Sequence, residues 1–211
     1  MSLRMKVFII ANGVPPKTGG LEEWTFQLAC LLTAEKYSVT VVVAGPQASS
    51  DILSPDGPEV LFLEDLRAKW EAPLLASEAW WRRDTEGRRL NFLLCKNIIS
   101  ARVRLHEERF LIITNFAIGT GYLGMLLAEE CKARHLACVV GTDFSRGFRN
   151  PEERQILEAV CRSAWLVVAK STEQAPSLAE FAKQMKVIPT PGRWLVRKLA
   201  GGSESAGCLA G

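Results

Sequence analysis

The chain has 211 residues, of which 48% are hydrophobic and 23% are charged, proportions typical of a soluble globular protein that can bury a proper core. The formal net charge of +3 is too small to indicate nucleic-acid binding, so no nucleic-acid partner is expected. No apolar run approaches the roughly 18 residues that span a bilayer, and the run near the N-terminus is too short for a signal peptide.

The first predicted element is a buried strand that leads into a glycine pair. Residues 7–11 are apolar without alternation, which predicts a strand buried on both faces, and a helix is expected to begin at Gly20 or Leu21. Gly19 and Gly20 leave backbone N–H groups uncovered at the positive end of that helix, which favours a phosphate or carboxylate ligand. A tight turn without a ligand is the alternative, because the segment matches neither the dinucleotide fingerprint nor the P-loop.

Strand-like and helix-like segments alternate along most of the chain. The predicted strands are residues 7–11, 39–44, 60–63, 110–114, 137–141, 166–169 and 186–188. The predicted helices are residues 21–34, 121–133, 151–163 and 173–183. This alternation predicts an α/β fold: a single Rossmann-like, doubly wound parallel sheet of about seven strands with helices on both faces.

The interval between residues 64 and 108 is long, basic and helical in pattern. Its apolar stripe consists of Leu90, Leu93, Leu94, Ile98, Ala101 and Leu105. Its candidates for membrane contact are Trp80, Trp81, Arg82, Arg83, Arg88 and Arg89. Two interpretations stay open: docking on an anionic membrane surface, or a stripe that packs on the sheet and leaves a solvated basic face.

The regular pattern stops after Ile188. A proline-rich segment, residues 189–192, predicts a linker, and residues 199–211 are rich in glycine and serine. We therefore predict one Rossmann-like domain at residues 1–189, followed by a linker remnant and flexible tail at residues 190–211.

Six cysteines occur without a C-x-x-C pair, beside only two histidines. Five of the cysteines lie in apolar patterns, which predicts buried free thiols and not a metal site. Free thiols indicate a reducing compartment, so a cytoplasmic location is expected. Peripheral contact with the inner face of the membrane stays open.

In their order and spacing, these segments resemble the N-terminal, acceptor-side domain of a large family of retaining, nucleotide-sugar-dependent glycosyltransferases with the GT-B fold (group 1, or family 4, type). Residues 19–22 are similar to the family's G-G-x-E loop, and residues 137–144 resemble its strand ending in R-G-[ST]-D. Residues 153–171 are similar to its arginine-bearing helix and V-V-x-x-S strand. The similarity covers about 180 residues.

The resemblance implies transfer of a sugar from a nucleotide-diphosphate sugar to a saccharide or lipid-linked acceptor, with retention and without a metal. Donor-phosphate and cleft contacts are implied for Gly19, Gly20 and Glu22, and acceptor or cleft-lining positions for Asn115, Gly119, Gly141, Thr142 and Ser171. A catalytic role is implied for Asp143, which follows a predicted strand. The alternative is that its carboxylate caps the turn after that strand.

Two departures from the family pattern matter. Val140 stands where the family commonly has His or Arg, which removes a donor to the transferred sugar. Glu78 and Glu86 match the E-x7-E spacing of the family's donor-binding domain but lie between the third and fourth predicted strands, so we regard the match as chance. We therefore expect the donor-binding domain to be absent from this chain, and activity to depend on such a domain or subunit as a partner.

Two other function classes are alternatives to a glycosyltransferase. The first is a non-catalytic scaffold or membrane-recruiting subunit of a two-chain glycosyltransferase, which would use the basic Trp/Arg segment. The second, a dinucleotide-dependent oxidoreductase, suits the fold class but lacks its glycine fingerprint.

Overall fold

The computed structural model describes residues 5–15, 20–43, 57–63, 85–103 and 109–188. Seven strands form one sheet in the order β3-β2-β1-β4-β5-β6-β7, and every neighbouring pair is parallel. The strands are β1 (Lys6–Ala11), β2 (Ser38–Val43), β3 (Glu59–Phe62), β4 (Phe110–Thr114), β5 (Arg134–Val139), β6 (Leu166–Ala169) and β7 (Met185–Val187). The predicted Rossmann-like α/β fold is confirmed.

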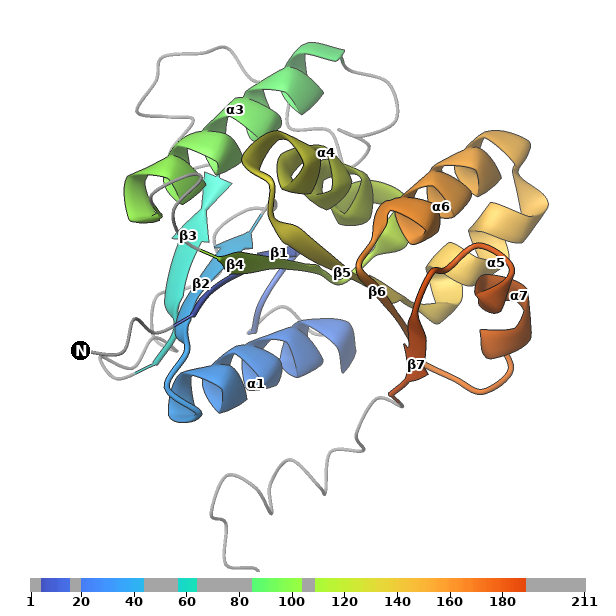
Figure 1. The fold of residues 1–211 in the computed structure, drawn as a ribbon, viewed down its shortest axis with the longest axis horizontal. Coiled ribbons are helices and arrows are strands. Elements are labelled where there is room, and N and C mark those ends of the chain that lie inside the picture. Colours follow the sequence, from blue (N-terminus) through green and yellow to red (C-terminus); the bar gives the residue numbers. More distant parts are fainter. Residues whose placement is uncertain (1–4, 16–19, 44–56, 64–84, 104–108, 189–211) are drawn as a thin grey trace, which may run out of the picture.

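Helices cover both faces of the sheet. They are α1 (Gly20–Ala34), α3 (Thr85–Arg102), α4 (Tyr122–Cys131), α5 (Gly141–Arg149), α6 (Pro151–Ser163) and α7 (Ala175–Ala179), with a π-helical turn, η2 (Ala117–Gly121), before α4. Helix α1 lies on one face, and α3, α4 and α6 lie on the other (Figure 1).

The central strands are buried on both faces, as their continuous apolar sequences require. Five of the six residues of β1 and of β2 are buried. On the α1 face, Trp24 and Ala29 of the helix pack with Ile9, Val41 and other strand residues. The opposite face packs against α3 and α4, with Ile98, Ile99 and Leu127 among the buried residues.

Helix α1 begins where the sequence predicts. Its first residue is Gly20, and Glu22 and Glu23 occupy the first turn, where the helix dipole favours acidic side chains. Because α1 starts at the carboxyl end of β1, its N-terminus lies at the edge of the sheet where ligands of this fold class bind.

Several elements differ from the predictions. Strand β5 begins three residues and ends two residues earlier than the predicted 137–141, and β2 and β3 each lie one residue earlier than predicted. Helix α7 has five residues instead of the predicted eleven-residue segment 173–183, because Pro176 at its start prevents an earlier beginning. Helix α5 was missed, because its nine residues are mostly polar or small. Strand β7 lies one residue earlier than predicted.

The basic interval forms helix α3 in its described part. Of the predicted apolar stripe, Leu94 and Ile98 are buried and Leu90 is half-buried, whereas Leu93 and Ala101 are exposed and Leu105 lies outside the described residues. Arg102 pairs with Glu59, and Lys96 pairs with Glu130 of α4, so these two cations are used within the protein. Arg89 is exposed. Trp80, Trp81, Arg82, Arg83 and the side chain of Arg88 lie outside the described residues, as do the predicted linker and tail at residues 190–211.

Four of the described cysteines, Cys95, Cys131, Cys138 and Cys161, are buried as predicted, and Cys30 is half-buried. None of these five forms a disulfide with another described cysteine. No helix in the described part of the chain is both long enough and apolar enough to cross a membrane.

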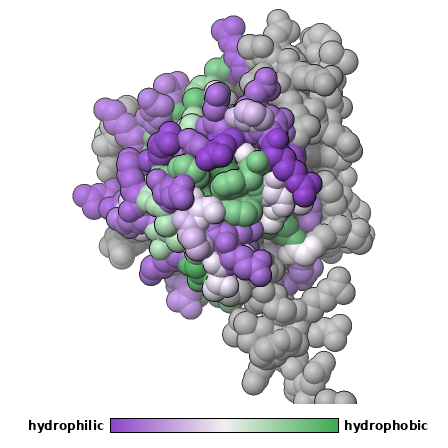
Figure 2. Space-filling view, turned by 90° about the vertical axis from the view of Figure 1, so that its right-hand side faces the viewer, coloured by the Kyte–Doolittle hydropathy of each residue, from purple (hydrophilic) through white to green (hydrophobic). Residues whose placement is uncertain are grey.

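The face that carries α5, α6 and α7 is mostly hydrophilic, with a small hydrophobic area near its centre (Figure 2). Phe148 of α5 is among the exposed hydrophobic residues of these helices, and its ring lies 4.6 Å from that of Phe144. Isolated apolar surface of this extent is ordinary and predicts no particular partner.

Candidate functional site

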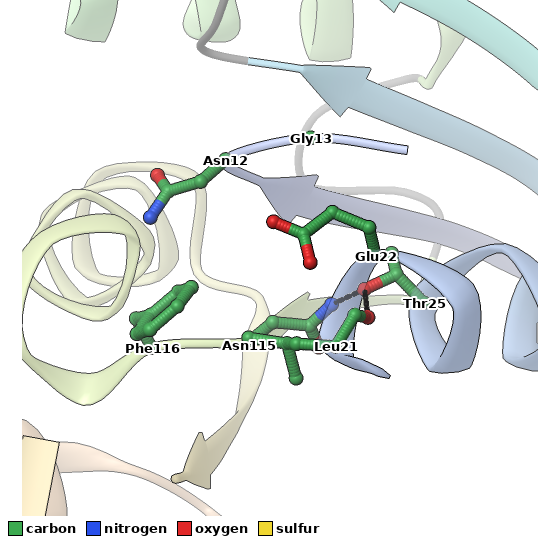
Figure 3. Close-up of a pocket in the computed structure, with 7 residues that line it drawn as sticks. All are labelled: Asn12, Gly13, Leu21, Glu22, Thr25, Asn115 and Phe116. Carbon is green, nitrogen blue, oxygen red and sulfur yellow. Dashed lines mark hydrogen bonds between the residues drawn. The ribbon is translucent and has the colours of Figure 1, made fainter. Parts of the chain in front are cut away.

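The middle of the sheet contains a point where the chain direction reverses. From β1 the chain passes through α1 to β2 on one side, and from β4 it passes through η2 and α4 to β5 on the other. Open α/β sheets bind ligands at the carboxyl ends of the strands at such a switch point. A shallow hollow that is open to solvent, which we call the pocket, lies there and is lined by Asn12, Gly13, Leu21, Glu22, Thr25, Asn115 and Phe116 (Figure 3).

Asn115 presents an unused acceptor at this pocket. The Thr25 hydroxyl donates its only proton to the Leu21 carbonyl at 2.6 Å, so the Asn115 atom facing that hydroxyl must be a donor, Nδ2. The other amide atom, Oδ1, is buried and has no partner among the described residues. Asn115 itself is only 1% exposed. A buried acceptor without a donor is uncommon and calls for an explanation.

Glu22 and Asn12 add further polar groups. Figure 3 shows the Glu22 carboxylate extended into the space between Asn12 and Asn115. Both Glu22 and Asn12 are half-buried. A carboxylate and an amide oxygen accept hydrogen bonds, so the pocket is suited to a ligand group that donates them, such as a hydroxyl.

The turn after Asn115 is built around two glycines. Gly119 has φ = 120° and ψ = −104°, a backbone conformation that other residues rarely adopt. Gly121 donates its N–H to the Phe116 carbonyl at 2.6 Å, and a Cβ there would lie 2.5 Å from that oxygen. These glycines allow η2 to turn tightly, with Phe116 placed at the pocket wall.

Asp143 is buried in the first turn of α5, at 2% exposure. Its Oδ2 accepts the backbone N–H of Ala117 at 2.8 Å, which ties α5 to η2. Burial raises the pKa of this carboxyl to about 7, although the N–H groups of Ala117, Ile118 and Val140 act in the opposite direction. This geometry favours the turn-capping interpretation over a carboxylate that faces a substrate.

The other predicted site residues lie at the same edge of the sheet but do not line the pocket. Gly20 is exposed, with open space around its Cβ position, and Gly19 lies outside the described residues. Gly141 and Thr142 are exposed at the start of α5, and Ser171 is half-buried after β6. Of the predicted residues that the structure describes, Glu22 and Asn115 are the two that line the pocket.

Lys170 is a functional candidate that the sequence reasoning missed. It directly follows β6, and its Nζ lies 3.0 Å from the centroid of the Trp24 ring. This ammonium is buried without a hydrogen-bond partner within the described part of the chain. Burial lowers its pKa to about 8. A signal was present in the sequence, because Asn12 and Lys170 are polar residues directly after buried strands, as Asn115 is.

Among the described residues, no group of three or more His, Cys, Asp or Glu side chains is arranged to hold a metal ion. No protein-family model matches the sequence, and no curated protein matches it at a significant level.

Solved structures do resemble this fold. Arabidopsis thaliana UGT89C1 matches with a TM-score of 0.56 in its complexes with UDP-L-rhamnose (13% identity, 92% of this chain and 50% of that chain) and with UDP (14% identity, 90% and 53%). Anabaena HepE in complex with UDP matches with a TM-score of 0.50 and 17% identity over 93% of this chain and 50% of that one. The chain therefore spans about half the length of these glycosyltransferases, and at such identities the likeness shows the fold alone.

Proposed function

We propose that this chain forms the acceptor-side wall of a glycosyltransferase active site. In this proposal a sugar moves from a nucleotide-diphosphate sugar to a saccharide or lipid-linked acceptor, with retention of configuration. The observation that carries it is the pocket at the β1/β4 switch point, where Glu22 and Asn115 offer acceptors to a hydroxyl. The fold shared with proteins crystallised with UDP or UDP-L-rhamnose supports a nucleotide sugar as the donor.

The pocket groups would orient the acceptor. Hydrogen bonds from an acceptor hydroxyl to the Glu22 carboxylate and to Asn115 Oδ1 would fix its direction of attack, and such positioning contributes strongly to catalysis. The negative charge of Glu22 makes the pocket itself unsuitable for a phosphate. We place the donor phosphates instead near Gly20, where the exposed N-terminus of α1 would stabilise charge on the leaving diphosphate.

Most donor contacts would come from a second domain facing this edge, in the same or another chain. The isolated chain should then bind UDP-glucose or GDP-mannose with a Kd no tighter than about millimolar. A micromolar Kd for the isolated chain, measured by calorimetry, would contradict the acceptor-side assignment. A cytoplasmic location is part of the proposal and is supported by the described cysteines, none of which pairs with another.

A matched pair of variants tests the pocket. Glu22→Gln removes the charge that points into the pocket, whereas Glu23→Gln makes the same change at the next residue, whose carboxylate accepts from Gln27. Saccharide binding, followed by NMR shifts of the labelled protein, should weaken about tenfold in Glu22→Gln, because hydrogen bonds to charged groups are the strong ones. Equal affinities in the two variants would show that the pocket does not bind the acceptor.

A further inference from the structure

Lys170 carries a charge that the described protein leaves unsatisfied. An ammonium has three N–H donors, yet Nζ is buried and makes no hydrogen bond to a described residue. The face of Trp24 attracts the cation at 3.0 Å but supplies none of those hydrogen bonds. Burying a charge in this way is unfavourable unless a partner is gained.

The described groups around this ammonium provide no counter-charge. Cys138 of β5 faces it, and burial raises the pKa of that thiol to about 12, so the sulfur is neutral near pH 7. None of the ion pairs formed by described residues includes Lys170. A cation without an acidic partner among the described residues, at the edge of the sheet where ligands bind, is poised to pair with an anion from outside.

Asn115 and Lys170 flank the end of β5. Asn115 follows β4 and contacts Thr25, whereas Lys170 follows β6 and contacts Trp24, the preceding residue of α1. Strand β5 lies between these two strands, and Val140 and Gly141 follow it. A ligand that extends over the end of β5 would therefore meet an acceptor on one side and a cation on the other.

We propose that Lys170 binds an anionic group, a phosphate or a carboxylate, on the acceptor whose hydroxyl occupies the pocket. The inference rests on the proposed function and names its substrate class: an acidic saccharide. The Lys170 residue is half-buried overall, but its Nζ is fully buried, so the exposed atoms belong to its aliphatic chain or backbone. Rotation of this flexible stem would carry the ammonium from Trp24 to the anion, where it would form charge-assisted hydrogen bonds.

The test compares four probes: glucose phosphate, glucuronate, neutral glucose and inorganic phosphate. Binding to the full chain is measured by calorimetry, and the response of Trp24 is taken as the emission of the wild type minus that of Trp24→Phe. The variant is Lys170→Met, which keeps the length of the stem. Its matched control is Lys186→Met, the same change at an exposed residue of the neighbouring strand β7.

The two acidic sugars should bind the wild type about tenfold or more tightly than glucose. Lys170→Met should abolish this advantage and Lys186→Met should preserve it. The preference between glucose phosphate and glucuronate identifies the anion. An advantage that survives in a folded Lys170→Met variant would overturn the inference. If that variant does not fold, the Trp24 response of the wild type decides: acidic sugars must change it and glucose must not.

Failure of the two proposals is distinguishable. If no sugar binds but inorganic phosphate still changes the Trp24 emission, the saccharide function is wrong and the anion site stands. If glucose binds and neither acid gains affinity, the assignment of Lys170 is wrong and the acceptor pocket stands. If no anion binds at all, the anion site is wrong.

Discussion

Two regions of this sheet differ in how their polar and charged side chains are partnered. On the flank formed by β3, α3 and α4, charges are paired: Arg102 with Glu59, which also accepts from Thr40 at 2.9 Å, and Lys96 with Glu130. At the carboxyl edge, Asn115 Oδ1 and Lys170 Nζ are buried without partners among the described residues. Pairing stabilises the fold, whereas a buried polar group without a partner costs stability, and at the ligand-binding edge of the sheet a ligand can supply that partner.

The largest expected effect concerns Asp143, the buried acid near that edge. Its pKa is raised from 3.8 to about 7, so the folded protein binds more protons than the unfolded chain between those pH values, and stability falls as pH rises through this window. At 1.36 kcal/mol per pH unit the loss is about 4 kcal/mol. The side chain introduced by Asp143→Asn cannot be charged but keeps an oxygen that accepts from the Ala117 N–H. The stability of this variant relative to the wild type should therefore increase by about 4 kcal/mol between pH 4 and pH 8.

Urea unfolding at both pH values measures that difference. Glu153 and Cys161 of α6 also face Asp143, and Glu153 is paired with Arg146. If the difference in unfolding free energy between wild type and Asp143→Asn does not change with pH, burial does not raise the pKa of the Asp143 carboxyl, and this prediction is wrong.

His135 gives the next largest effect, with the opposite sign. Its Nε2 lies 2.9 Å from the Thr114 hydroxyl, its Nδ1 is buried without a partner in the described residues, and burial lowers its pKa from 6.5 to about 4. The unfolded chain binds the additional proton, so the stabilisation is complete above pH 6.5 and falls by about 3 kcal/mol as pH decreases to 4.

His135→Gln should remove that acid sensitivity, because a neutral amide can keep the bond to Thr114. The Asp143 and His135 contributions partly cancel in the wild type, so the quantity to compare is the difference between wild type and variant at pH 7 and pH 4.5. His135 shows that a buried atom without a partner does not always mark a ligand site. Its side chain packs against Gly124 of α4, away from the carboxyl edge of the sheet, so the Nδ1 atom belongs to the buried interior.

Much of the fold could be predicted from the sequence, because apolar runs and helical stripes record burial directly. Strands β1 and β4 and the start of α1 agree with their predictions. Helix α5 was missed in part because it contains Gly147, and glycine usually indicates a turn. Here the glycine allows close packing against α6, because a Cβ at this position would lie 2.7 Å from Leu157.

The site was harder to predict, because its chemistry depends on contacts between distant segments. The resemblance to the glycosyltransferase family implied Glu22 as a donor-phosphate or cleft contact and Asn115 as an acceptor or cleft-lining residue, and the structure brings the two together. Asn115 Oδ1 is left without a partner among the described residues because the Thr25 hydroxyl donates to Leu21. Lys170 Nζ lies against Trp24 and has no hydrogen-bond partner in the described part of the chain. Neither fact follows from residue type or spacing.

A smaller effect compares one cation from each region. Arg102→Met breaks a pair in which both side chains are partly exposed, 30% and 45%, and should destabilise the protein by about 0.5–1 kcal/mol. Lys170→Met removes a buried charge that has no hydrogen-bond partner among the described residues, and should leave the unfolding midpoint at pH 7 unchanged or raised. Thermal and urea unfolding check both. Greater destabilisation by Lys170→Met than by Arg102→Met would mean that the edge cation serves stability, and the contrast between the regions would fail.

The smallest effect is expected at the Lys96–Glu130 pair. Hydrogen bonding between the two groups raises the pKa of Lys96 and lowers that of Glu130, which favours the ionised pair, but both side chains remain substantially exposed. Solvent and salt screen such a pair, and ordering two long side chains opposes it. A double-mutant cycle with Lys96→Met and Glu130→Gln should therefore give no measurable coupling in urea unfolding at physiological salt, and a small one only at low salt. Coupling as large as that of Arg102 with Glu59 would show that the whole flank acts as one charge network, so that its polar groups contribute to stability collectively and not as separate pairs.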